Sequence, residues 1–239
     1  MDLLFYHYYA NVYLMNSLPN SPFQSGEINS SELSPVLYEH AAHPDKLIRQ
    51  HIEFGLEEAN PIEATLNGLR KSIELFNDLE SNYGIAHVGF QPVIGELPSG
   101  DVAAYIVSDR IDGYGYMPAP DQEKKTYLEN LTLKPEHKPA GIALLQSLSD
   151  YWTDKVANHK DMLTDIFSID QYVYEPTSGE FVLVDMDPLF AESSQMKDEV
   201  DSQWVLTYTG DKLQTLAKAL LDSHELEVWQ KEMAATAST

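Results

Sequence analysis

The apolar run Phe181–Val184, which leads directly into Asp185-Met186-Asp187, constrains the fold more than any other feature of this sequence. Four consecutive apolar residues predict a strand that is buried on both faces. Because side chains alternate along an extended chain, Asp185 and Asp187 would point the same way from its C-terminal end. Neighbouring carboxylates repel each other unless a cation neutralises them, and oxygen ligands suit Mg²⁺ or Mn²⁺. The motif predicts a metal site; the alternative is a pair of solvated acids that cap a strand.

Two further acids precede this strand. An irregular segment that contains Asp165 and Asp170 leads to a short predicted strand over residues 171–174, and a turn over 175–179 follows. We expect the short strand to pair with the apolar run, which would bring all four acids to one end of the same ribbon. A long helix is predicted before them, over 141–163. Its apolar stripe consists of Leu145, Leu148, Trp152, Val156 and Leu163.

The chain begins with a terminal segment and loop over residues 1–34, which is rich in Asn, Ser, Pro and Gly towards its end. A hairpin is expected next, over 36–52. Its turn is predicted at 41–45, because Pro44-Asp45 is favourable turn chemistry and β-branched or aromatic residues stand on both sides.

One helix separates this hairpin from two more strands. Asn60-Pro61 is a typical helix start, and Gly84 would end the helix. Strands are expected over 86–94 and 102–107. The helix has a single apolar stripe, formed by Ile62, Leu66, Leu69, Ile73, Phe76 and Leu79.

The pattern of the C-terminal region, residues 211–233, also predicts helical structure. Its spacing indicates a face that packs against a core. The core candidates are Leu213, Leu216, Leu220, Leu221 and Trp229.

The charge of the chain restricts its partners. Fifteen basic and 38 acidic residues give a net charge of −23. Such a surface repels nucleic acid, so we expect no nucleic-acid binding. The acidity favours solubility, and the alternative interpretation is a docking surface for a basic protein partner.

The composition also bears on the compartment. With no cysteine, the chain has no disulfide, thiolate zinc site or thiol nucleophile, which fits a reducing environment. No apolar stretch approaches the roughly 20 residues of a membrane span. We therefore expect a cytoplasmic protein without a membrane partner. The usual serine-hydrolase, P-loop and Rossmann motifs do not occur in the sequence.

The order of helix, Asp165, Asp170, strand, turn, strand and Asp185-x-Asp187 resembles the C-lobe of the protein-kinase-like superfamily, and most of all the aminoglycoside and choline kinase branch. The resemblance covers roughly residues 35–187. It implies an α+β, two-lobed fold around a central cleft. Residues 35–113 would form a small N-lobe with an antiparallel sheet and one helix, and residues 114–239 a larger, mainly helical C-lobe.

The resemblance also implies roles for individual residues in a phosphotransferase that uses Mg-ATP on a hydroxyl group of a small molecule or protein. Asp165 would be the catalytic base. Asp170 stands where the family has a metal-binding asparagine, and Asp185 and Asp187 would be further magnesium ligands. For the ATP cofactor, Arg49 would contact the phosphates, and Lys46 is the poorer candidate because the turn lies beside it. A carboxylate from the helix would hold this cationic side chain in place. Glu74 is preferred for that role over Glu63.

Two alternatives stay open, and departures from the family pattern motivate the first of them. No glycine-rich loop precedes the first hairpin, and Leu163-Thr164 replaces the usual His-Arg. Arg49 replaces a lysine, and its planar guanidinium meets phosphate differently from an ammonium group. The first alternative is therefore an inactive, pseudokinase-like module that binds a protein. The second is a metal-dependent glycosyltransferase, in which the Asp-x-Asp motif would hold a sugar nucleotide.

Overall fold

The structure is a computed structural model, and it describes residues 37–40, 43–50, 73–96, 102–117, 123–157, 166–184 and 199–236. These residues form an α+β protein with two small antiparallel sheets and several helices, as the sequence predicts at this coarse level. They divide into two compact units. The first contains the described residues up to Ile73 together with 88–110, and the second contains 74–87 and 111 onwards.

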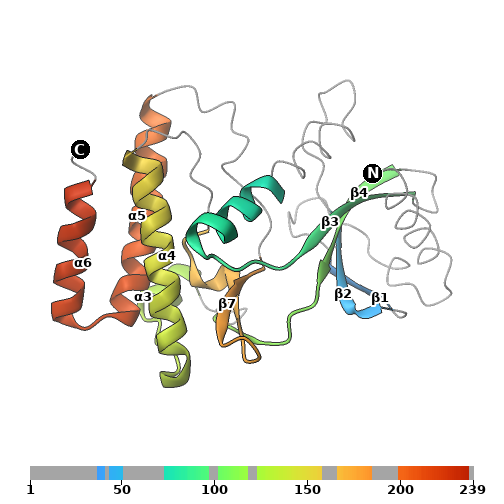
Figure 1. Cartoon of the computed structure of the whole chain (residues 1–239), viewed down its shortest axis with the longest axis horizontal. Helices are drawn as coiled ribbons and strands as arrows, with labels where there is room; N and C mark the ends of the chain where they lie inside the picture. Colours follow the sequence, from blue (N-terminus) through green and yellow to red (C-terminus); the bar gives the residue numbers. More distant parts are fainter. Residues whose placement is uncertain are drawn as a thin grey trace. The chain divides into compact units, whose positions relative to one another are not determined.

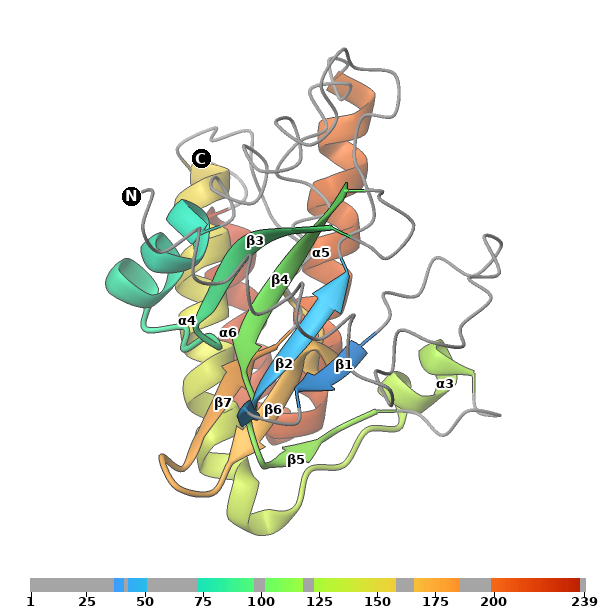
Figure 2. The same ribbon diagram turned by 90° about the vertical axis from the view of Figure 1, so that its right-hand side faces the viewer.

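The first unit is built on a four-stranded antiparallel sheet. Its strands are β1 (Leu37–His40), β2 (His43–Gln50), β3 (Phe90–Glu96) and β4 (Val102–Asp109). They lie in the order β1-β2-β4-β3, which can be followed in Figure 2. The predicted hairpin and the predicted pair of later strands are therefore confirmed, and β4 joins them into one sheet.

The predicted turn at 41–45 is too long. Strand β2 already begins at His43, so Pro44 and Asp45 lie within the strand. Long-range pairing explains the difference, because the Arg110 backbone N–H donates a 2.8 Å hydrogen bond to the Asp45 carbonyl and Lys46 lies opposite Asp109. Strand β4 thus extends β2 into residues that favour a turn locally.

The strand predicted over 86–94 begins later, at Phe90. The residues before it make contacts elsewhere, since the Ala86 carbonyl accepts a 2.9 Å hydrogen bond from the Leu183 N–H and His87 forms an isolated bridge with Leu183. Ala86 and His87 belong to the second unit, whereas β3 belongs to the first.

Residues 73–83 are helical, and all but Ile73 belong to the second unit, which confirms the described part of the predicted helix. Phe76 and Leu79 are buried, and Gly84 ends the helix with a positive φ of 67°, a conformation that glycine adopts without steric cost. The Tyr83 hydroxyl donates a 2.6 Å hydrogen bond to Asp154 and joins this helix to α4.

Helix α4 (Lys138–Ala157) packs against α5 (Glu199–Leu220) and α6 (Ser223–Thr236), as Figure 1 shows. The Trp152 indole N–H donates to the buried Thr209 hydroxyl on α5 at 3.1 Å. The Trp229 indole donates to the Ser149 hydroxyl at 3.0 Å, which connects α6 to α4. These bonds let large aromatic rings enter the interface without leaving a polar group unpaired. The short helices α3 (Lys124–Glu129) and η2 (Pro135–His137) precede α4.

The helical structure predicted over 211–233 is confirmed, but it is divided between two helices with a break, because α5 ends at Leu220 and α6 starts at Ser223. Asp222 causes the break by accepting the Glu225 backbone N–H at 2.9 Å, while the Glu225 carboxylate accepts the Asp222 N–H at 2.9 Å. This reciprocal pair is a capping box, which starts a new helix. Of the predicted core residues, Leu213, Leu216 and Leu220 are buried, whereas Leu221 and Trp229 are half-buried.

A second sheet, in the order β5-β6-β7, completes this unit. Its strands are β5 (Tyr114–Gly115), β6 (Tyr172–Glu175) and β7 (Glu180–Leu183). The predicted hairpin between the last two strands is confirmed, with its turn at 176–179. No helix within the described residues combines the length and the apolarity that crossing a membrane requires.

Candidate functional site

The candidate site lies at the end of the β6–β7 hairpin that is opposite its turn. Tyr172 is paired with Leu183, and beyond this pair the Val184 N–H donates a 3.0 Å hydrogen bond to the Gln171 carbonyl. Asp170 precedes Gln171 in the chain, and Asp185 follows Val184. The backbone therefore brings together the residues that flank these two acids.

The segment that enters β6 is fixed by its own polar groups. Residues Ile169–Gln171 form the 3₁₀ helix η3, and the Ser168 N–H donates to the Gln171 side-chain oxygen at 3.2 Å. The Gln171 N–H donates back to the Ser168 carbonyl at 3.1 Å. Ser168 and Gln171 are buried, so their hydrogen bonds are shielded from water and hold this turn in one geometry.

Asp170 is half-buried within η3 and accepts a hydrogen bond from the Ser168 hydroxyl. The Asp170 carboxylate also affects Tyr127 on α3. Burial raises the pKa of Tyr127 above its ordinary value, and electrostatic interactions with Tyr114 and Asp170 raise it further. Asp170 therefore contributes to the electrostatic environment of Tyr127 on α3.

The residue that follows Asp165 is also held in place. The Tyr172 hydroxyl donates a 2.7 Å hydrogen bond to the Ile166 carbonyl, and both side chains are buried. Ser168, Gln171 and Tyr172 thus act as positioning residues that the sequence did not single out. A buried tyrosine usually has a hydrogen-bond partner, but the sequence does not say which one.

The predicted site residues are described to different extents. Asp165, Asp185 and Asp187 lie outside the described residues, so the four-acid metal cluster stays a prediction; among the described residues, no group of three or more potential metal-binding side chains occurs. Arg49 lies on β2 opposite Ile106, with its side chain outside the description. Glu74 is exposed on the helix over 73–83, while the alternative Glu63 lies outside the described residues.

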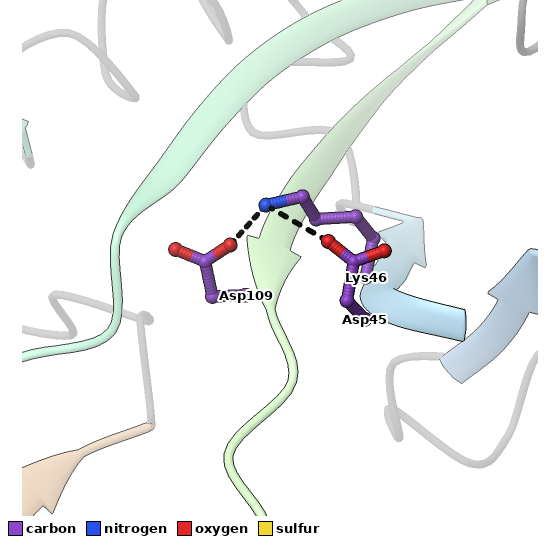
Figure 3. Close-up of polar contacts among 3 residues, drawn as sticks. All are labelled: Asp45, Lys46 and Asp109. Atoms are coloured by element: carbon purple, nitrogen blue, oxygen red, sulfur yellow. Dashed lines mark hydrogen bonds and ion pairs between the residues drawn. The ribbon is translucent and has the colours of Figure 1, made fainter. Parts of the chain in front are cut away.

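Lys46, the second candidate for a phosphate contact, pairs with carboxylates in the first unit. Its ammonium group forms an ion pair with Asp109 and lies 3.6 Å from the Asp45 carboxylate, as Figure 3 shows. The two acids come from β2 and from the end of β4, which are neighbouring strands. The arrangement neutralises Lys46 locally and ties together the two strand ends.

A scan against protein-family models matched no family, and a search of curated proteins found no relative.

Proposed function

We propose that this chain is a phosphotransferase with a two-lobed, protein-kinase-like fold, which transfers the γ-phosphoryl group of Mg-ATP to a hydroxyl group. The order of the described elements supports the proposal. A strand pair, a helix and a second strand pair come first, followed by helix α4, the segment with Asp170, and the β6–β7 hairpin. This is the order that the kinase resemblance implies.

The observation that carries the proposal is the hydrogen bond between the Val184 N–H and the Gln171 carbonyl. It extends the hairpin by one pair of residues beyond Tyr172 and Leu183. In the sequence, Asp170 directly precedes Gln171 and Asp185 directly follows Val184. In this proposal the two carboxylates would be neighbours, and such a pair favours a divalent cation, which offsets their mutual repulsion.

The chemistry then divides among four acids. Asp185, with Asp187 in support and Asp170 opposite, would bind Mg²⁺ together with phosphate oxygens of ATP. Asp165 would accept the proton of the attacking hydroxyl. The rigid segment over 166–172 would keep Asp165 in register with the metal ligands, because positioning and electrostatic stabilisation supply most of the catalysis in phosphoryl transfer. Arg49 would contribute a further phosphate contact.

Nucleotide binding tests this proposal before any acceptor is known. Isothermal titration of ATP, ADP and UDP-glucose, with and without Mg²⁺ or Mn²⁺, would be run on the wild type, Asp185→Asn and Asp170→Asn. Asp150→Asn is the matched control, because Asp150 is an exposed residue of α4 that accepts a 2.8 Å hydrogen bond from Gln146. We expect metal-dependent ATP binding in the wild type and control, weakened at least about tenfold in Asp185→Asn, which corresponds to about 1.4 kcal/mol.

The other outcomes are equally informative. Absence of ATP binding to a folded wild type would refute the phosphotransferase and leave the pseudokinase-like module. Metal-dependent binding of UDP-glucose in place of ATP would support the glycosyltransferase. Equal ATP binding by wild type and Asp185→Asn would refute the proposed metal site.

A further inference from the structure

A cavity of about 730 Å³ opens in the second unit, and neither the predicted acids nor the proposed metal site accounts for it. It lies between α3, α5 and the segment Phe167–Ile169. Its volume falls within the range of 300–1,000 Å³ that is common for small-molecule sites. The cavity is therefore large enough for an organic ligand rather than for an ion alone.

The inner wall of the cavity is apolar. It is formed by four buried residues from three separate segments: Leu131, Phe167, Ile169 and Leu216. Water in contact with such a wall lacks hydrogen-bond partners, so an apolar group of a ligand gains free energy by displacing it. The wall predicts a ligand with an apolar body.

The outer wall is polar and comes mainly from α5. Tyr208, Lys212 and Thr215 recur at helical spacing on the face of α5 that lines the cavity, and the Lys212 ammonium group lies 4.3 Å from the centre of the Tyr208 ring. Lys212 and Lys218 balance Asp211 and Glu129 in this wall, whereas the whole chain carries a net charge of −23. The cavity is thus locally balanced and suits an uncharged polar group.

The position of the cavity suggests its use. Phe167 and Ser168 line it, and they follow the proposed catalytic base Asp165 by two and three residues. Ser168 also donates its hydroxyl hydrogen to Asp170, so the cavity wall and the proposed metal site share one rigid turn.

We propose that the cavity binds the phosphoryl acceptor, and that this acceptor is a small, uncharged alcohol with an apolar body. The inference rests on the proposed function. In the reaction, the alcohol oxygen would form a bond to the γ-phosphorus of ATP while the bond between that phosphorus and the β–γ bridging oxygen breaks. The hydroxyl proton passes to the Asp165 carboxylate, and ADP leaves with the bridging oxygen.

The first test measures binding without nucleotide, using 2-phenylethanol as the probe in saturation-transfer NMR. Thr215→Phe fills the cavity from α5, and Gln214→Phe provides a second filling variant if the first fails to fold. Thr207→Phe is the matched control, since Thr207 is exposed on the same helix and does not line the cavity. We expect equal binding in the wild type and control and at least about fivefold weaker binding in a folded filling variant, or roughly 1 kcal/mol.

Equal binding in the wild type and a filling variant, or no binding to the wild type at millimolar probe, would overturn the inference. A second measurement tests the acceptor role: ADP formation from Mg-ATP in the presence of 2-phenylethanol or its methyl ether, which has no transferable proton. We expect 2-phenylethanol to accelerate ADP formation and its methyl ether to have no effect. The acceleration should occur in the wild type and in Thr207→Phe, but not in the filling variants.

The two proposals fail in different ways. In one case, the protein binds Mg-ATP in a way that depends on Asp185, and Thr215→Phe does not change the binding of 2-phenylethanol. This result would refute the acceptor site and leave the phosphotransferase. If the wild type binds no ATP, the phosphotransferase and the acceptor role are refuted. Loss of 2-phenylethanol binding in Thr215→Phe would still support the cavity as a ligand site in that case.

Discussion

The hydrogen bond from Tyr172 to the Ile166 carbonyl offers the sharpest test of how the candidate site is held together. The bond is 2.7 Å long, and Tyr172 is only 1% exposed. Tyr172→Phe keeps the ring and creates almost no cavity, so the change isolates the hydroxyl. It removes one hydrogen bond and leaves a buried carbonyl without that donor, for which a cost of about 1–3 kcal/mol is typical. We expect the second unit to lose about 1.5 kcal/mol of unfolding free energy.

Urea unfolding followed by tryptophan fluorescence measures this loss. All three tryptophans, at 152, 204 and 229, belong to the second unit, so their fluorescence reports that unit alone. With a denaturant slope of about 2 kcal/mol per molar, the midpoint should fall by roughly 0.7 M without a change of slope.

Tyr174→Phe is the control, because Tyr174 is half-buried on the same strand and the same hydroxyl is removed there. It should change the unfolding free energy by less than about 0.5 kcal/mol. A loss below about 0.5 kcal/mol in Tyr172→Phe would refute the reasoning, since the buried carbonyl would then have found water or another donor.

Two further substitutions test the second unit. Gly113→Ala should destabilise it by about 1–3 kcal/mol, because the added Cβ would lie 2.3 Å from the Tyr174 carbonyl oxygen; Gly115→Ala, where the nearest atom is 3.7 Å away, should have a much smaller effect in the same urea assay. Asp222→Asn should remove part of the acid sensitivity of this unit. Hydrogen bonding from the Glu225 backbone N–H lowers the pKa of Asp222 below its ordinary value of 3.8, so this stabilisation is present above about pH 4 and is lost as the pH falls through the lowered pKa. Asparagine can cap the helix without titrating. If the wild-type and variant stabilities fall in parallel below pH 4, Asp222 is not a source of the acid sensitivity.

Local sequence patterns predicted much of the second unit. The stripe of Leu145, Leu148 and Trp152 is buried in α4, and the apolar run from Phe181 forms the buried part of β7. Gly84 ends its helix as expected. Such signals are local, because the helical period, the apolar run and the freedom of glycine act within a few residues of one another.

The boundary between α5 and α6 also has a local signal in the sequence. Asp222 and Glu225 have the spacing of a capping box, and this pair divides the helical C-terminal region into α5 and α6. Hydrophobic periodicity alone continues through the break, because Leu220 and Trp229 both suit a helix that faces a core.

The sequence by itself thus determined the α+β class and most of the described helices and strands, and it also led to the proposal of a metal site at the four acids. The tertiary structure alone decided that β2 extends through Pro44, that Ala86 bonds to Leu183 rather than extending β3, and that a cavity lies between α5 and Phe167. It also decided that Gln171 and Val184 meet at the candidate site. The physical reason is that a backbone N–H or carbonyl has no side-chain identity, so its distant partner depends on how the chain is folded and not on the local pattern.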